Sequence, residues 1–146
     1  MSEGILAQRN IGIDLALETA KAALEAGRAR GYSIAVAVAD RGGQLLVLLR
    51  SDGAGPHLID SARRKACTAA SANTRTSAMS KAIDERSGVP DPHLIYLEGV
   101  LMVGGGVPLA AGGELIGAIG IAGSPGSVHD EECADAAIAH IAPLLK

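Results

Sequence analysis

The sequence contains no Phe and no Trp, and its two tyrosines are Tyr32 and Tyr96. Base stacking, sugar stacking and the walls of most pockets for flat ligands rely on aromatic faces, so this absence argues against nucleic acid, carbohydrate and flat ligands alike. The core must consist of Ala, Val, Ile and Leu, whose small side chains let helices and strands pack closely. A net charge of -3 gives no reason to expect a polyanion or an acidic membrane as a partner.

Cysteines and long apolar runs are also scarce. Cys67 and Cys133 are far apart, form no C-x-x-C pair and lie in Ala-rich stretches, which favours two buried thiols. No stretch approaches the ~18 apolar residues that cross a bilayer. The first ten residues lack the basic and then apolar pattern of a secretory signal. We therefore expect a cytoplasmic protein with no membrane partner.

A chain of 146 residues is expected to form a single domain over 1–146, with one core. Helical spacing of apolar residues predicts a long first helix over 5–30. Two apolar segments, 33–39 and 44–49, flank an Asp-Arg-Gly-Gly turn and predict a β-hairpin. Helices are predicted over 56–72, over a shorter segment ending near residue 88, and from 127 onward. Residues 96–103, 107–111 and 114–122 predict three further strands, which gives an α/β domain with five strands.

Three polar residues near the second helix are candidates for ligand contact. Arg50 leaves a strand before a glycine-rich loop, where its guanidinium is placed to bind a carboxylate or to pair with Asp52 or Asp60. His57 lies in the first helical turn, where the helix dipole favours a neutral imidazole suited to ligation or to general base chemistry. Lys65 shares the apolar side of the helix, so its stem either covers the core or carries its ammonium to a ligand.

A second group of candidates lies in the last third of the chain. Gly104, Gly105 and Gly106 offer successive backbone amides that can form an anion-binding nest, or simply a tight turn. They do not match a nucleotide-binding motif, because no helix with Lys and Ser or Thr follows. Asp130 and Glu131 are placed to complement a helix dipole. The histidines show no metal-ligand spacing, so no metal site is predicted from local sequence.

Taken together, several short segments resemble the GlcG/HbpS-like family in order and spacing. They are DRGGQL from Asp40, RSDGA from Arg50, RKACTA from Arg64, GGVPL from Gly105 and GAIGIAG from Gly117, followed by Asp130. The resemblance implies a layered α/β fold with a five-stranded antiparallel sheet covered by helices. It also implies homo-oligomers, often large and even-numbered, such as an octamer. Some members bind haem or related tetrapyrroles, and others are associated with small oxidised carbon compounds.

Two functional hypotheses follow. In the first, the protein is a small-ligand-binding accessory protein in which Arg50, His57, Lys65 and the Gly104 to Gly106 loop hold haem, the candidate cofactor, or another small carboxylate. The sequence departs from the haem-binding members of the family, because the segment over 5–30 contains no histidine to ligate iron and no Phe or Trp is present to stack on a porphyrin. Haem binding would therefore have to use His57, His129 or a surface residue at a subunit interface. In the second, the protein is a small catabolic lyase, isomerase or hydrolase in which Arg50 or Lys65 holds a carboxylate and His57 or Asp52 moves a proton.

Overall fold

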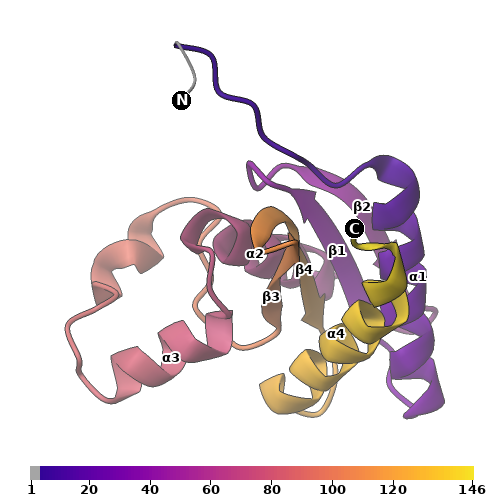
Figure 1. Cartoon of the computed structure of the whole chain (residues 1–146). Helices are drawn as coiled ribbons and strands as arrows, with labels where there is room; N and C mark the ends of the chain where they lie inside the picture. The colour runs from indigo at the N-terminus through magenta and orange to yellow at the C-terminus, as the bar shows by residue number, and fades with distance from the viewer. Residues whose placement is uncertain (1–3) are drawn as a thin grey trace.

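The computed structural model describes residues 4–146, which form a single sheet between helices (Figure 1). The helices are α1 (Ile13–Ala29), α2 (His57–Ala72), α3 (Thr76–Asp84) and α4 (Ser127–Ile141), with short 3-10 helices η1 (Pro92–Tyr96) and η2 (Ala142–Leu144). The strands are β1 (Ala35–Asp40), β2 (Leu45–Arg50), β3 (Gly106–Ala111) and β4 (Glu114–Ala122). No helix within residues 4–146 is long and apolar enough to span a membrane.

The sheet is antiparallel throughout, in the order β2-β1-β4-β3. The predicted β1–β2 hairpin is confirmed, and Gly43 adopts a φ of +81° in its turn. The β3–β4 hairpin turns at Gly112 and Gly113, both with positive φ. The two central strands pair in full register, with Val36 opposite Ile121. These pairings place the end of β2, the end of β4 and the start of β3 at the same end of the sheet.

The prediction of a fifth strand over 96–103 is wrong, and the described chain has a four-stranded sheet. Pro92 starts η1, and the Asp91 carboxylate accepts a hydrogen bond from the His93 backbone N–H, which favours a helical turn. The later backbone groups bond to α2 side chains. The Leu101 N–H donates to Thr68 Oγ1 at 2.9 Å, and the Val100 carbonyl accepts from Arg64 at 2.7 Å. Side chains of α2 thus replace the neighbouring strand that this segment would otherwise need.

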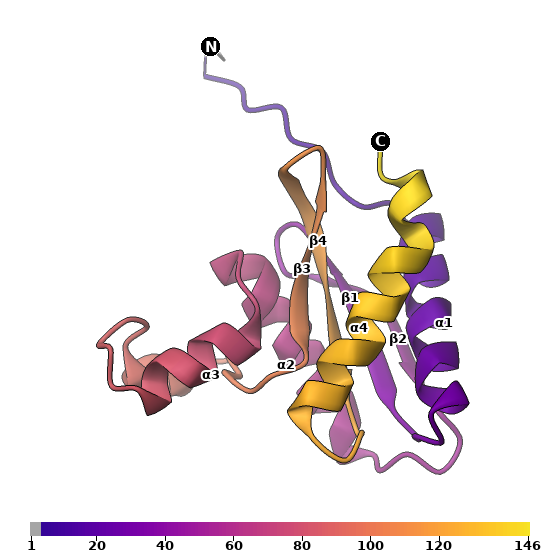
Figure 2. The same cartoon turned by 60° about the horizontal axis from the view of Figure 1, so that its bottom comes forward.

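The sheet is covered by α2 on one face and by α1 and α4 on the other (Figure 2). Small side chains make the α2 side unusually close. Alanines of β1 pack against Ala62 and Ala66, and a Cβ on Gly120 would collide with the α2 backbone, 2.6 Å from the Ala66 nitrogen. The opposite face carries the larger side chains, including Ile34, Ile119 and Ile141. The small-residue face of the strands is therefore occupied by a helix of the same chain.

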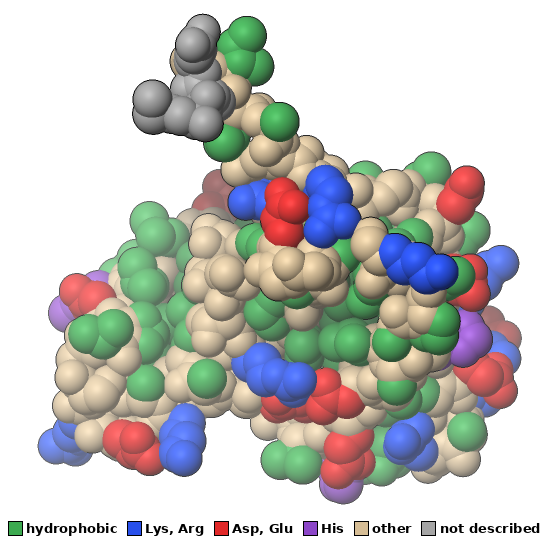
Figure 3. Space-filling model, viewed as in Figure 1, with side chains coloured by type: hydrophobic (Ala, Val, Ile, Leu, Met, Phe, Trp, Pro, Cys, Tyr) green, Lys and Arg blue, Asp and Glu red, His purple; other side chains and the backbone are tan. Residues whose placement is uncertain are grey.

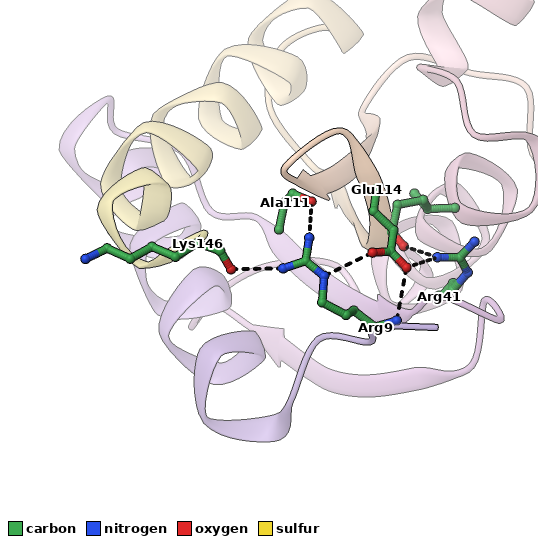
Figure 4. A network of polar contacts seen from close by, with 6 residues as sticks. Arg9, Arg41, Ala111, Glu114 and Lys146 are labelled. Atoms are coloured by element: carbon green, nitrogen blue, oxygen red, sulfur yellow. Dashed lines mark hydrogen bonds and ion pairs between the residues drawn. The ribbon is translucent and has the colours of Figure 1, made fainter. Parts of the chain in front are cut away.

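The first helix begins at Ile13, not at residue 5, because residues 9–11 bond to the β3–β4 hairpin instead. The Ile11 N–H donates to the Ile116 carbonyl at 2.9 Å. Arg9 binds the Glu114 carboxylate through its backbone N–H at 3.1 Å and its Nε at 3.0 Å, and Arg41 reaches the same carboxylate at 3.3 Å (Figure 4). These contacts hold the segment extended along the hairpin until Gly12, after which α1 starts.

Residues 74–103 form a lobe that projects from the sheet and contains α3 and η1 (Figure 1). The start of the lobe is held to α4 and β3 by polar contacts of Arg75 and Thr76. Large apolar side chains are exposed on it, and hydrophobic patches are visible on this side of the surface (Figure 3). The exposed residues are Val89, Ile95, Tyr96, Leu97 and Val103. The lobe thus exposes several large apolar side chains to solvent within one short segment.

Candidate functional site

Lys65 lies inside the protein, not at its edge. Its side chain is 4% exposed, and its Nζ donates to the Ile121 carbonyl at 3.0 Å and to Asp130 Oδ2 at 3.3 Å. The other Asp130 oxygen accepts the Ser124 N–H at 3.1 Å. The helical pattern correctly indicates that Lys65 faces the core, but the ammonium and its carboxylate partner form a buried pair that ties α2 to β4 and α4. Asp130 therefore does more than complement the helix dipole.

Two of the three glycines, Gly105 and Gly106, pack against Lys65, and Gly104 packs against Ser127 and Ser77. Gly105 has a φ of +128°, and a Cβ there would lie 3.0 Å from Lys65 Nζ and would collide with the Ile121 carbonyl. The Gly106 N–H donates to Thr76 Oγ1 at 2.8 Å, and the Gly105 carbonyl accepts the Ile121 N–H at 3.0 Å. All three residues are buried. The structure therefore brings Lys65 and the glycine loop together. The Lys65 side chain passes so close to Gly105 that only glycine fits at this position.

Arg50, Asp52 and His57 lie near the start of α2 and away from Lys65. Arg50 donates to the Ala54 carbonyl at 2.6 Å, within its own loop, and Asp52 is exposed. The His57 imidazole is exposed and rests beside Gly55. His57 is the first residue of α2 and Lys65 is the ninth, about 12 Å further along the helix axis. His57 and Lys65 therefore do not form a paired acid and base.

His129 sits in the first turn of α4 and is partly exposed. Its ring centroid is 5.9 Å from that of Tyr32, and its Nδ1 lies 3.2 Å from a Glu132 carboxylate oxygen. It shares no recorded contact with His57 or Lys65. Within residues 4–146, no three His, Cys, Asp or Glu side chains are grouped closely enough to hold a metal ion.

The protruding lobe is fastened at its first residues. Arg75 donates to Asp135 Oδ1 at 2.8 Å and also binds Glu131, both on α4. These carboxylates raise the pKa of the Arg75 guanidinium, which is charged at any accessible pH. Thr76, fully buried, accepts the Gly106 N–H. The start of α3 is therefore fixed to α4 and β3, and this fixes the position of the rest of α3.

Next to these contacts, α3, η1 and residues 100–103 line an open cavity of about 300 Å³. Sequence reasoning missed it. Its apolar wall is formed by one α3 residue, one η1 residue and the segment that follows, namely Ile83, Ile95, Val100, Leu101, Met102 and Val103. Ser80, Asp84 and Arg64 complete the lining. The available signal was the apolar stretch over 94–103, interrupted by Glu98 and Gly99.

Arg64 is the cation of this cavity, although the helical pattern predicts that it faces water. Its Nη2 donates to the Val100 carbonyl at 2.7 Å, and its side chain is 30% exposed. A mostly apolar hollow with a few polar groups at defined positions is the usual form of a small-molecule site. Arg50, His57, Lys65 and His129 do not line this cavity.

Comparison with known proteins agrees with this fold. The model of the family described as "Haem degrading protein HbpS-like" matches residues 11–139. Protein GlcG of Escherichia coli strain K12 is 34% identical over 99 residues, which cover 66% of this chain and 69% of GlcG. A crystal structure of an HbpS double mutant from Streptomyces reticuli is 38% identical, with a TM-score of 0.85, and covers 97% of this chain and 93% of that chain.

A crystal structure of a PduOC–haem complex has a TM-score of 0.80 at 27% identity, over 89% of this chain and 94% of that chain. The family model spans most of the sequence, and the fold matches solved members along nearly its whole length. The protein described here therefore belongs to the HbpS-like family.

Proposed function

We propose that this protein is a small-ligand-binding accessory protein that takes haem or a related tetrapyrrole into the cavity between α3, η1 and residues 100–103. The observation that carries the proposal is the chemistry of the lining, which combines apolar walls with one arginine and one thioether. The family description and the relative solved with haem support the same ligand class.

The donor set fits a tetrapyrrole. The ring is apolar, as are the walls, while its propionates require a cation, which Arg64 provides. Met102, buried and part of the lining, offers a thioether, a known axial ligand of haem iron. A volume of about 300 Å³ lies at the lower end of ligand pockets, so part of a tetrapyrrole would extend over exposed Ile95 and Val103 at the rim.

The alternative, a catabolic enzyme acting on a carboxylate metabolite, has less support. It needs an acid and a base in one pocket. The Lys65 ammonium is already bound by Asp130 and the Ile121 carbonyl, and His57 is about 12 Å away along α2. A ligand site at Arg50, His57, His129 and the glycine loop, without catalysis, stays a second location for the same ligand, and the experiment below distinguishes the two.

Haem titration tests the proposal, with the Soret band as readout. The wild-type protein is expected to shift the band at stoichiometric ratio. Met102→Leu should alter the band and lower the reduction potential of the bound haem, because a thioether ligand raises that potential. Met79→Leu is the matched control, since Met79 is equally buried but lines a separate hollow with Val89 and Pro90. Absence of any shift in the wild-type protein would contradict the proposed function.

Variants at the other location separate the two sites. His57→Ala and His129→Ala should leave the Soret band unchanged if the ligand enters the α3 cavity. Loss of the shift in either variant, with Met102→Leu behaving as wild type, would move the site to the start of α2 or α4.

We also propose that the chain forms a homo-oligomer, of which an octamer is one candidate. The exposed apolar side chains of the lobe favour burial against another surface. Native mass spectrometry of the purified protein measures the subunit number, and a monomer at micromolar concentration would refute this part of the proposal.

A further inference from the structure

The Arg64 guanidinium is held in place, but only part of its hydrogen-bonding capacity is engaged. Within residues 4–146 it donates one hydrogen bond, from Nη2 to the Val100 carbonyl at 2.7 Å. Its Nη1 lies 3.8 Å from Asp60 Oδ2, which is beyond hydrogen-bonding distance. A guanidinium carries five N–H donors, so most of them are free for a further partner.

The nearest carboxylate is already engaged elsewhere. Asp60 binds Arg63 at 2.6 Å, so it satisfies its neighbour in preference to Arg64. Asp84, the other acid near the cavity, forms no recorded ion pair with Arg64. Asp60 is the one anionic partner of Arg64 among the described residues, at 3.8 Å and without a hydrogen bond, and the Arg64 side chain is 30% exposed, so a ligand can reach its remaining N–H donors.

We infer that Arg64 binds a carboxylate of the ligand, so that the cavity selects tetrapyrroles with free propionates over the same rings with esterified ones. The inference rests on the proposed function, because it takes the same cavity as the ligand site. A planar guanidinium binds a carboxylate through two parallel N–H bonds. The bond to Val100 orients the fork before the ligand arrives, which reduces the entropy lost on binding.

The effect of such a charged hydrogen bond on ligand affinity can be estimated. Hydrogen bonds to charged groups contribute enough to change affinity about 10- to 100-fold. The partial exposure of Arg64 places its effect toward the lower end of that range, because solvent screens the interaction. Asp84 lines the same cavity and repels a carboxylate, so Asp84→Asn is expected to strengthen binding of the free acid slightly and to leave the ester unaffected.

The test compares iron-free protoporphyrin with its dimethyl ester, by porphyrin fluorescence, so that iron ligation plays no part. The wild-type protein should bind the free acid about tenfold or more tightly than the ester. Arg64→Gln keeps a donor for the Val100 carbonyl and removes the charge, and it should bind both porphyrins equally. Arg64→Lys keeps the charge but not the fork, and should retain part of the preference.

Arg63→Gln is the matched control, because Arg63 has the same charge, is adjacent, and is 42% exposed and paired with Asp60. It should discriminate like the wild type. Equal affinity of the wild-type protein for acid and ester would overturn the inference and leave the proposed function standing. Binding of neither porphyrin would refute the proposed function and the inference with it. The wild-type comparison decides both points even if an Arg64 variant fails to fold.

Discussion

Replacement of Lys65 by methionine tests whether this lysine stabilises the fold or serves a ligand. Methionine preserves most of the length of the side chain but removes the ammonium, so the Asp130 carboxylate is left with the Ser124 N–H alone. The two side chains are 4% and 6% exposed, so solvent screens the pair little. Breaking a buried pair by removing one partner costs about 3–5 kcal/mol, because a charge stays buried without compensation.

Urea unfolding followed by circular dichroism measures this loss, and a thermal scan should show Tm lowered by roughly 10–15 °C. The double variant Lys65→Met/Asp130→Asn is the control. It removes the stranded charge and keeps an acceptor for Ser124, so it should regain most of the lost stability. A loss below about 1 kcal/mol in the single variant, the range of solvent-exposed pairs, would refute the structural role argued here. Retained porphyrin binding by the folded single variant would place the ligand away from Lys65.

Three further predictions concern the scaffold. Gly120→Ala should destabilise the protein by about 3 kcal/mol, at the upper end for overpacking, because the new Cβ meets the α2 backbone. Gly126→Ala, where the space is open, should cost only the N-cap preference of α4, about 1 kcal/mol or less, in the same unfolding assay. Burial raises the pKa of the Cys133 thiol, so alkylation of the native protein near pH 8 should label Cys67 first, and equal rates for both thiols, read by mass spectrometry, would contradict this. Hydrogen bonds from Arg9 lower the pKa of Glu114 below its ordinary 4.5. This contact therefore stabilises the fold above pH 4.5, and the stabilisation is lost as pH falls through the lowered pKa. Glu114→Gln should flatten that acid dependence of Tm.

Local sequence patterns predicted most of the scaffold. The β1–β2 hairpin, α2, β4 and α4 all carry a strong period and clear end signals, and all are present in the structure. The segment over 96–103 is different because its apolar residues fit a strand equally well. Its conformation depends on hydrogen bonds with the side chains of Arg64 and Thr68, which lie more than thirty residues earlier in the chain. No local pattern contains that information.

The same limit applies to the candidate site. Helical spacing predicted that Lys65 faces the core, but not that Asp130, 65 residues away, would pair with it. The spacing also predicted a solvent-facing Arg64. Residues 94–103 of the lobe cover this side of α2, and their path could not be predicted from local sequence. Sequence thus identified which residues are polar and near α2, whereas the fold decided which of them lines a cavity.

The close contact between α2 and the sheet has a mechanical consequence. Where large side chains separate a helix from a sheet, the helix can shift by rearranging their rotamers, as interiors adapt to changed volume. Here the backbone of α2 rests on Gly120 and the alanines of β1, and almost no side-chain volume lies between them. The helix that carries Arg64 and Lys65 therefore has little freedom to slide or tilt, so a ligand in the proposed cavity would have to be accommodated by the lobe facing it. A core without large aromatic residues in this way holds the residues on the far side of the helix in fixed positions.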